Sequence, residues 1–540
     1  MAPRSTVETP VLIVGAGPVG LALAADLGLR GIACLVIEQG EGTPDHPRAS
    51  ALNARTMEFL RRFGVADAVR AAGTPEDFPH TALYCTTLNG FEIARIERPH
   101  HGGSGPTPES PERPQRCNQL WLDPILHDLA ASLASVQLRY RCRFDALAQE
   151  DGVVIATAHD LASDEPVRIA AQYVVDCSGG HSPIRGGFGI EMSGSSYVGH
   201  NLSIFVRAPR LWEHHPMGKA ALISFVEPKG LWRNLVMLDG RELYRFGVHG
   251  KVYFDAPDAV DADRLFEEVV GRPVPHQVIS LRRWTGRNVV AERYRQGRVF
   301  LAGDAAHLNH PASGLGLNTG FGDAVDLAWK LAATLDGWGG NSLLDSYEIE
   351  RHPVGVRNVG HASMTFDDDR NRTPHPEIAL DTPAGREARR IMGEAIVRTQ
   401  TRKFITDGIA LGYRYDPSPI CWGEDGPAPP LTVSEYRPTT YPGSRAPHAW
   451  LSPGVSTIDQ FGRGFVLLRL GDAPPDPSLI ERAFGERGVP LRIVTSADPA
   501  IAALYERSLV LVRPDGHVAW RSDALPADPR ALVDRVRGAV

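Results

Sequence analysis

Three glycines near the amino terminus, Gly15, Gly17 and Gly20, have the spacing Gly-x-Gly-x-x-Gly and directly follow the apolar run 11–14. In a strand-turn-helix unit the first glycine permits a tight turn, the second lets the backbone approach a pyrophosphate, and the third lets helix and strand pack closely. Glu38 ends the next apolar run, at the place where such a unit positions the acid that binds a ribose hydroxyl. This order of strand, glycines, helix, strand and acid predicts a dinucleotide site.

The apolar stretch 10–25 also has features of a secretion signal, because Ala22 and Ala24 resemble a small-residue cleavage site. Cleavage there would discard the glycines, and Arg4 is the only basic residue ahead of the stretch. We therefore interpret the stretch as the start of a nucleotide-binding fold.

A second carboxylate, Asp304, follows Gly303 at the end of the apolar run 299–302. A loop rich in glycine and proline comes next and leads into 321–335, where apolar residues recur with helical period. A flavin needs this arrangement, because a carboxylate orients its ribityl hydroxyls and backbone N–H groups at a helix start hold its electron-rich pyrimidine edge. A plain connector would explain the glycines but not an aspartate directly after a buried strand.

Three separated motifs resemble the FAD-dependent aromatic hydroxylases, the single-component flavoprotein monooxygenases of the para-hydroxybenzoate hydroxylase and phenol hydroxylase type. They are the glycine motif with Glu38, "VVDCSGGHSPIR" at 174–185, and "GDAAHLNHPASGLGLNTGFGDAVDLAWKLA" at 303–332. The resemblance implies FAD and NAD(P)H as cofactors, with Arg48 and Gln119 as further FAD contacts. The full set of expected cofactor-binding residues is Gly15, Gly17, Gly20, Glu38, Arg48, Gln119, Gly303, Asp304, Gly316, Leu317 and Asn318.

The carboxyl-terminal part resembles one branch of this family. "LGYRY" at 411–415 and "YPGSRAPHAWL" at 441–451 are similar to the phenol and chlorophenol branch, typified by 2,4-dichlorophenol 6-monooxygenase. That resemblance implies a thioredoxin-like last domain. The chain has no C-x-x-C pair, which excludes a redox role for it. We expect this domain to serve packing or dimer contact, and the protein to be a homo-oligomer.

The sequence departs from the family's pattern at positions that bear on catalysis. Ser178 stands where the family has an aspartate linked to the binding of FAD and reduced nicotinamide, and a hydroxyl carries no charge. His310 precedes a single Pro311, and Ser50 stands where phenol hydroxylases have an acid that helps to activate the phenol. His310, Pro311 and Ser50 are the candidate catalytic residues. An ordinary histidine pKa of about 6.5 suits the deprotonation of a phenol, and the alternative is a hydrogen-bonded loop histidine.

The expected fold class is α/β: a Rossmann-like FAD-binding domain with an inserted antiparallel substrate-binding sheet and a C-terminal thioredoxin-like domain. Strand-like runs separated by turns favour the inserted sheet. Its Phe205, Phe225, Trp232 and Tyr244 would line a substrate pocket, and the alternative for each of them is a place in the hydrophobic core. The expected boundaries are 1–190 for the first part of the FAD-binding domain, with a mobile loop near 99–114, 191–287 for the sheet, 288–370 for the second part, 371–435 for a helical linker and 436–540 for the last domain.

Composition argues against several function classes. The 540 residues include 57 Lys plus Arg against 64 Asp plus Glu, a net charge of -7 with no basic block, which argues against nucleic acid as a partner. No apolar run is long enough to span a bilayer, so we expect no membrane partner. The 6 cysteines are scattered without zinc-like spacing, which predicts no metal site and favours a reducing cytoplasm.

The resemblance to the aromatic hydroxylases implies a monooxygenase that hydroxylates a phenolic or similarly electron-rich aromatic molecule, using FAD, NAD(P)H and O2 through a flavin C4a-hydroperoxide. Two alternatives remain open. One is a tailoring oxygenase of a larger polyketide-like or pyridinol natural product, since the sequence does not reveal the size of the pocket. The other is a flavin-binding protein with little oxygenase activity, motivated by Ser178 and Ser50.

Overall fold

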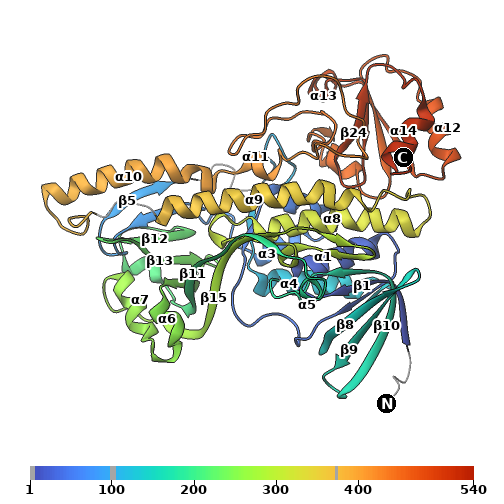
Figure 1. Ribbon diagram of the computed structural model, residues 1–540. Helices are drawn as coiled ribbons and strands as arrows, with labels where there is room; N and C mark the ends of the chain where they lie inside the picture. Colours follow the sequence, from blue (N-terminus) through green and yellow to red (C-terminus); the bar gives the residue numbers. More distant parts are fainter. Residues whose placement is uncertain (1–5, 98–104, 371–374) are drawn as a thin grey trace.

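Two large sheets dominate the computed structural model, which describes residues 6–97, 105–370 and 375–540 (Figure 1). The first sheet has the order β16-β17-β10-β1-β2-β7, and its strands from β17 to β7 are parallel. A hairpin of β8 and β9 extends β10 on one side. These strands are β16 (Arg295–Gln296), β17 (Val299–Leu301), β10 (Glu165–Asp176), β1 (Thr6–Val14), β2 (Cys34–Ile37), β7 (Val136–Arg139), β8 (Cys142–Glu150) and β9 (Val153–Asp160).

Helices cover the parallel sheet because its central strands are apolar on both faces. Val11, Leu12 and Ile13 of β1 are fully buried. The core that contains them also includes residues of α1 (Pro18–Leu29), α4 (Gln119–Ser132) and α8 (Gly316–Leu335). The strand, turn and helix predicted around the glycine motif are confirmed, as are the strand before Asp304 and the helix after its loop.

The second sheet is larger than expected and is mixed. Its order is β18-β15-β11-β14-β13-β12-β4-β5, and β4 pairs with β12 in parallel, whereas the sequence predicted a purely antiparallel sheet within 191–287. β4 and β5 come from the segment assigned to the FAD-binding domain, because short strands carry no local signal of a distant partner. The strands are β18 (His307–Leu308), β15 (Gln277–Ala291), β11 (Met192–Arg207), β14 (Leu243–His249), β13 (Gly230–Met237), β12 (Leu222–Glu227), β4 (Ala82–Cys85) and β5 (Glu92–Ile96).

Long helices join the two sheets. α9 (Ser346–Arg370) runs beside α8 and continues over the mixed sheet, where α10 (Pro383–Phe404) packs on β4 and β5 (Figure 1). The segment 371–435, expected as a helical linker, contains α10 and α11 (Asp407–Ala410), and its residues 371–374 lie outside the described residues. Of the loop expected near 99–114, residues 99–104 likewise lie outside them. The shorter helices are α2 (Ala54–Arg62), α3 (Ala66–Ala72), α5 (Pro183–Gly187), α6 (Lys251–Asp255) and α7 (Ala262–Val270).

The carboxyl-terminal unit is a four-stranded sheet of order β22-β21-β23-β24. The strands predicted at 465–470 and within 508–521 are confirmed, and Asp515 and Gly516 lie in the turn between the last two. α12 and α14 cover one face of the sheet and α13 the other. The elements are β21 (Phe465–Leu470), α12 (Ser478–Glu486), β22 (Leu491–Ser496), α13 (Pro499–Tyr505), β23 (Leu509–Val512), β24 (Val518–Ser522) and α14 (Pro529–Val536).

Among the helices of the described ranges, none combines the length and hydropathy that a membrane span requires. In the same ranges, no cluster of three or more His, Cys, Asp or Glu side chains could hold a metal ion.

Candidate active site

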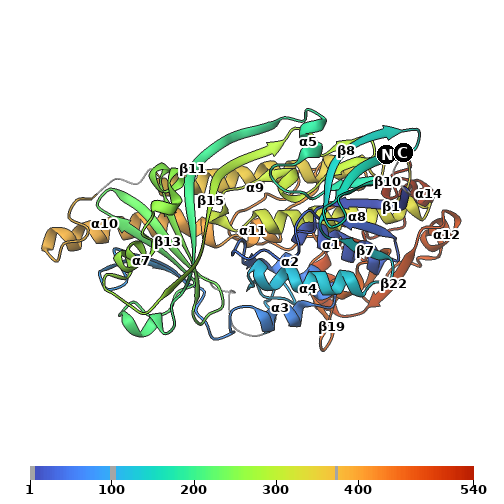
Figure 2. The same ribbon diagram turned by 90° about the horizontal axis from the view of Figure 1, so that it is seen from below.

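A cavity of 1110 Å³ extends from the carboxyl ends of the parallel strands to the mixed sheet. The long strands β11 and β15 connect these two regions of the molecule (Figure 2). Small-molecule pockets in proteins have volumes of about 300–1,000 Å³, so this cavity has room for more than one ligand. We call its two regions the cofactor end and the substrate end.

The glycine motif forms one wall of the cofactor end. Gly15 has φ +108°, and a Cβ there would lie 2.4 Å from the carbonyl oxygen of Cys177. Gly17 borders the cavity with no atom within 4 Å of an added Cβ. Gly20 is not part of the lining; its added Cβ would lie 2.0 Å from the Gly15 carbonyl oxygen, so it acts by close packing. Because no side chain caps α1, its first N–H groups are available to an anion.

Glu38 borders the same end of the cavity. Its Oε2 accepts a hydrogen bond from the backbone N–H of Ala16 at 3.0 Å, and its Oε1 accepts one from Gly40 at 2.7 Å. These bonds fix the orientation of the carboxylate beside the glycine turn. Each oxygen keeps acceptor capacity for a ribose hydroxyl.

Arg48 and Gln119 lie together in the lining. The Gln119 Oε1 accepts a hydrogen bond from the backbone N–H of Ala49 at 3.0 Å, and so holds the segment that presents Arg48. The Gln119 Nε2 donates to Asp123 at 3.4 Å. Burial raises the pKa of the Asp123 carboxyl to about 7.

Asp304 borders the cavity from the short helix that follows β17. Gly303 has φ +61° and lies behind the lining, where the Asp323 carboxylate accepts a hydrogen bond from its N–H at 3.0 Å. Gly316 and Leu317, at the start of α8, are lining residues. The amide of Asn318 is instead used on the protein itself, with Asn53 N–H, Thr56 Oγ1, Ala51 O and Gly314 O as its partners.

These features fit FAD. The open space over Gly17, the uncapped start of α1, the carboxylates of Glu38 and Asp304 and the start of α8 provide sites for a pyrophosphate, two sets of hydroxyls and a polar ring edge. The predicted cofactor residues therefore come together, except that Gly20, Gly303 and Asn318 support the lining from behind.

Ser178, which replaces the family's aspartate, also borders the cavity. Its hydroxyl donates to the Asp176 Oδ1 at 2.6 Å, and its backbone N–H donates to the same oxygen at 2.9 Å. Asp176 is fully buried beneath the loop and is not a lining residue. No carboxylate therefore takes the place of the missing aspartate at this position.

The three candidate catalytic residues all border the cavity. The Ser50 Oγ accepts a hydrogen bond from the Arg116 Nη2 at 2.9 Å. Pro311 follows His310 at the start of a short turn of helix. The His310 ring lies 4.3 Å from the Phe366 ring and 5.5 Å from the Trp284 ring, measured between centroids.

His310 does not keep the ordinary histidine pKa on which its role as a base was argued. Burial, and then the neighbouring His249 and Lys403, lower the pKa of the His310 imidazole to about 3. The ring is therefore neutral at neutral pH and holds a substrate proton only weakly. It can act there as a hydrogen-bond partner.

Polar side chains of the mixed sheet, which sequence reasoning missed, line the substrate end. The His249 Nδ1 donates to Asn201 Oδ1, and the Asn234 Nδ2 donates to the His249 Nε2 at 3.0 Å. Burial and Arg245 lower the pKa of His249 to about 4, so this chain of hydrogen bonds holds a neutral ring. The Asn234 Oδ1 is left buried without a hydrogen-bond partner.

Arg245 is the notable cation of the substrate end. Within the described ranges it has no ion-pair partner, and its Nε is buried without a hydrogen bond. Burial lowers the pKa of Arg245 to about 10. Lys403, by contrast, is paired with Asp369 at 2.5 Å. A basic residue inside the apolar strand Leu243–His249 is the one sequence signal that could have identified Arg245.

For three of the four aromatic side chains of the inserted sheet, the core alternative is the one found. Phe225 and Tyr244 pack in the core with α7, and Phe205 packs in a small cluster with Val236. None of the three borders the cavity. The side chain of Trp232 lies outside the described residues. Strand alternation explains Tyr244, because its neighbour Arg245 takes the cavity face.

Comparison with known proteins places both parts of the chain. Residues 8–362 match the model of the FAD binding domain family, and residues 439–539 match that of the aromatic-ring hydroxylase C-terminal family. The tetracenomycin B2 monooxygenase-dioxygenase of Streptomyces olivaceus is 34% identical over 98% of this chain and 98% of its own. A solved structure of the rebeccamycin biosynthetic enzyme RebC with reduced flavin is 41% identical, with a TM-score of 0.92 over 99% of this chain and 100% of that one.

Further relatives bear on the branch of the family. RebC with bound 7-carboxy-K252c is 41% identical, with a TM-score of 0.91 over 99% of this chain and 100% of that one. The 2,4-dichlorophenol 6-monooxygenase of Cupriavidus pinatubonensis is 28% identical over 97% of this chain and 94% of its own. That identity is below those of the tetracenomycin enzyme and RebC, so the expected place in the dichlorophenol branch is not specifically supported.

The family match and the full-length relatives agree with a cavity whose cofactor end suits FAD. The chain belongs to the FAD-dependent aromatic-ring hydroxylases and is a flavoprotein monooxygenase.

Proposed function

We propose that this monooxygenase hydroxylates a large, multi-ring aromatic molecule that carries an acidic group, with NAD(P)H as reductant. This is the tailoring-oxygenase alternative with its substrate class narrowed. The observation that carries it is the half-buried Arg245, which borders the substrate end of a 1110 Å³ cavity and has no ion-pair partner among the residues that the structure describes.

The size of the cavity supports a large substrate. Its lining reaches from Gly17 at the pyrophosphate position to Lys403 on α10 and Lys251 on α6. A volume above about 1,000 Å³ exceeds what one drug-sized ligand needs, so space remains beside a bound cofactor. The names of two relatives agree: one acts on tetracenomycin B2, and the RebC structure holds 7-carboxy-K252c.

The chemistry of Arg245 supports an acidic substrate. Partial burial of a guanidinium without an anion costs free energy, and a planar carboxylate matches its fork of N–H donors. Asp369 is already paired with Lys403, so it does not neutralise this charge. The Asn234 Oδ1 offers an acceptor on the neighbouring strand for a hydroxyl of the same ligand.

Bound FAD, once reduced, supplies the activation of O2 and the transfer of one oxygen atom to the aromatic ring. Gly15, Gly17, Glu38, Asp304 and the start of α8 would hold it. The other lining residues must then orient the substrate and exclude water.

We propose supporting roles for the three candidate catalytic residues. The Ser50 hydroxyl, whose oxygen accepts from Arg116, can donate its proton to a substrate oxygen. Neutral His310 can accept a hydrogen bond from a substrate hydroxyl, with its ring held beside Trp284 and Phe366. Pro311 shapes the adjoining backbone.

We also propose that the carboxyl-terminal unit is thioredoxin-like without redox chemistry. Its β21 and β22 are parallel, β23 and β24 are antiparallel additions, and helices cover both faces. A homo-oligomer stays a prediction.

The test uses the purified, FAD-loaded protein and three probes: a hydroxyanthraquinone carboxylate, its neutral parent hydroxyanthraquinone, and phenol. Stopped-flow absorbance follows flavin reduction by NADPH or NADH with each probe, and mass spectrometry follows incorporation of oxygen from labelled O2. We expect reduction to be accelerated most by the carboxylate and the product to gain one oxygen atom.

Two outcomes would contradict the proposal. Acceleration by phenol alone would restore the small-phenol hypothesis, because a single ring would then suffice. Acceleration by the neutral and acidic anthraquinones to the same degree would remove the acidic group from the proposed substrate class.

A further inference from the structure

Helix α8 contacts both the cofactor end of the cavity and the carboxyl-terminal unit. Its start faces the cofactor end through Gly316 and Leu317. Farther along, Trp329 packs 6.1 Å from Phe465 of the carboxyl-terminal sheet, measured between ring centroids. Trp329 belongs to the core of that carboxyl-terminal unit, residues 439–539, together with Phe465 and Leu511. The helix is therefore shared between the cofactor site and the carboxyl-terminal unit.

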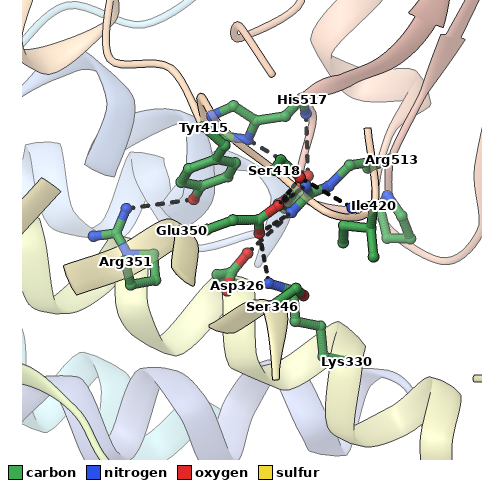
Figure 3. A network of polar contacts seen from close by, with 12 residues as sticks. Asp326, Lys330, Ser346, Glu350, Arg351, Tyr415, Ser418, Ile420, Arg513 and His517 are labelled. Carbon is green, nitrogen blue, oxygen red and sulfur yellow. Dashed lines mark hydrogen bonds and ion pairs between the residues drawn. The ribbon is translucent and has the colours of Figure 1, made fainter. Parts of the chain in front are cut away.

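A buried cluster of charges joins the same two parts (Figure 3). Arg513, just after β23, donates from its Nη1 and Nη2 to the two carboxylate oxygens of Glu350 on α9, at 2.6 and 2.9 Å. The Arg513 Nη2 also donates to Asp326 on α8 at 3.1 Å and to Asp515 at 2.6 Å. Lys330 Nζ donates to Asp326 at 2.7 Å and to Glu350 at 2.6 Å.

Complete burial makes this cluster sensitive to the loss of one member. The side chains of Asp326, Lys330, Glu350 and Arg513 are 0% exposed. Arg513 is the only cation that the carboxyl-terminal unit contributes to this cluster among the described residues. Without Arg513, the buried carboxylates of Asp326 on α8 and Glu350 on α9 would lose their charge-assisted hydrogen bonds to its guanidinium group.

A second set of contacts leads from the charge cluster to Gly303, the residue before Asp304. The Arg513 guanidinium lies 5.0 Å from the centre of the Tyr415 ring. The Tyr415 hydroxyl accepts a hydrogen bond from the Arg351 Nη1 at 3.3 Å (Figure 3). The Arg351 Nε donates to the Asp323 Oδ1 at 2.8 Å. The Asp323 Oδ2 accepts from the backbone N–H of Gly303 at 3.0 Å.

This path ends next to a cofactor residue. Gly303 precedes Asp304, which borders the cavity, so Asp323 sets the position of the turn that presents the Asp304 carboxylate. The Arg351 Nη2 also donates to the Thr319 carbonyl oxygen in the first turns of α8 at 2.9 Å. An added Cβ at Gly322 would lie 2.7 Å from that Nη2, so the helix has a glycine where Arg351 crosses it.

We propose that Arg513 is a positioning residue for the flavin site, and that the carboxyl-terminal unit acts through Arg513, Tyr415 and Arg351 to hold the Gly303–Asp304 turn and the start of α8 for FAD binding. This gives the unit a role that needs no cysteine pair. It also makes FAD affinity depend on a residue that does not border the cavity.

The test compares Arg513→Met with a control that weakens the same unit from its other face. Val510→Ala is the control, because Val510 is fully buried in the core that packs α13 and does not contact the charge cluster through its side chain. Each apoprotein is titrated with FAD by flavin fluorescence. The melting temperature and the visible circular dichroism of the bound flavin are recorded for each variant.

We expect Arg513→Met to raise the FAD dissociation constant by at least about fivefold and to alter the flavin spectrum. Val510→Ala should lower the melting temperature with the FAD dissociation constant within about twofold of the parent protein, because it lies outside the coupled set. Arg513→Lys should recover part of the affinity, since it keeps the charge without the planar fork.

Equal melting losses in the two variants with unchanged FAD affinity in both would overturn the proposal and leave Arg513 a purely structural residue. If Arg513→Met does not fold, the charge-balanced double variant Glu350→Gln, Arg513→Met replaces it, because Lys330 can then pair with Asp326 alone. A parent-like FAD affinity in that double variant would overturn the proposal as well.

Discussion

The two ends of the cavity are built in different ways. At the cofactor end, Gly15, Gly17, Glu38 and Asp304 each follow a parallel strand and belong to a short contiguous motif. At the substrate end, side chains come from separate strands and helices of the mixed sheet and its cover, as Arg245 on β14 does. The cofactor end can therefore be interpreted from local motifs in the sequence. The substrate end, which selects the substrate, depends on how distant segments pack together.

The largest expected effect is a loss of FAD affinity when the open space over Gly17 is filled without disturbing the packing of the fold. Gly17→Val adds a side chain where no atom lies within 4 Å, on a backbone of φ -72° that any residue adopts. We expect the apoprotein to fold normally and FAD affinity to fall by at least about 100-fold, since the side chain occupies the anion's place at the helix start. Fluorescence titration and apoprotein melting measure the two effects.

Gly15→Val is the contrasting variant for that experiment. Its φ of +108° and the 2.4 Å approach to the Cys177 carbonyl oxygen make it a folding defect, with a loss of about 2–4 kcal/mol. Retention of FAD by Gly17→Val would show that the pyrophosphate lies elsewhere.

The second prediction addresses the substrate end alone. Arg245→Met should weaken binding of the hydroxyanthraquinone carboxylate by about 10–100-fold, because a charge-assisted hydrogen bond is lost, and should leave FAD affinity unchanged. Titration with the anthraquinone, followed by the change in flavin absorbance, measures the first affinity, and titration of the apoprotein with FAD measures the second. Arg282→Met, which removes an exposed cation of β15, two strands from β14 in the same sheet, is the matched control. An equal loss for the neutral anthraquinone would contradict the anion site.

The third prediction concerns acid stability at the substrate end. The folded pKa of His249 is about 4, below the ordinary value of 6.5, so its neutral form stabilises the fold above pH 6.5 and that stability is lost as the pH falls towards 4. His249→Gln should shrink the stability difference between about pH 7 and about pH 5 by about 1–2 kcal/mol. Urea unfolding at the two pH values checks this. An undiminished difference would assign the acid sensitivity to other groups.

The smallest expected effect concerns Ser50, which borders the cavity. Ser50→Ala removes the oxygen that accepts from Arg116. The loss of one hydrogen bond to the substrate should lower kcat by up to about tenfold with FAD affinity unchanged. Steady-state turnover and FAD titration measure the two quantities. A fall in FAD affinity instead would move Ser50 to the cofactor end.

Local motifs made most of the cofactor end predictable. Glu38 and Asp304 were identified because an acid directly after a buried strand has few structural reasons to be there. Asn318 shows the limit of that reasoning. It was expected to contact the cofactor, but its amide makes hydrogen bonds to α2 and to the segments before α2 and α8, and the residue does not border the cavity.

The substrate end was not predictable in the same way. Tyr244 and Arg245 are neighbours, and only the pairing of β14 within the mixed sheet decides which of them reaches the cavity. β4 pairs with β12 although more than a hundred residues separate the two strands in the sequence, and no local sequence pattern predicts such a pairing.

The sequence by itself determined the cofactor class, the parallel strands and the helices that follow them, because those depend on short-range spacing of glycines, acids and apolar residues. Only the tertiary structure decided the size and charge of the substrate end and the neutral state of His310. It also decided the contacts that lead from Arg513 through Arg351 to Asp323 beside Gly303. Burial and charge pairing are properties of side chains that meet from distant segments, and these meetings exist only after the sheets and helices have packed.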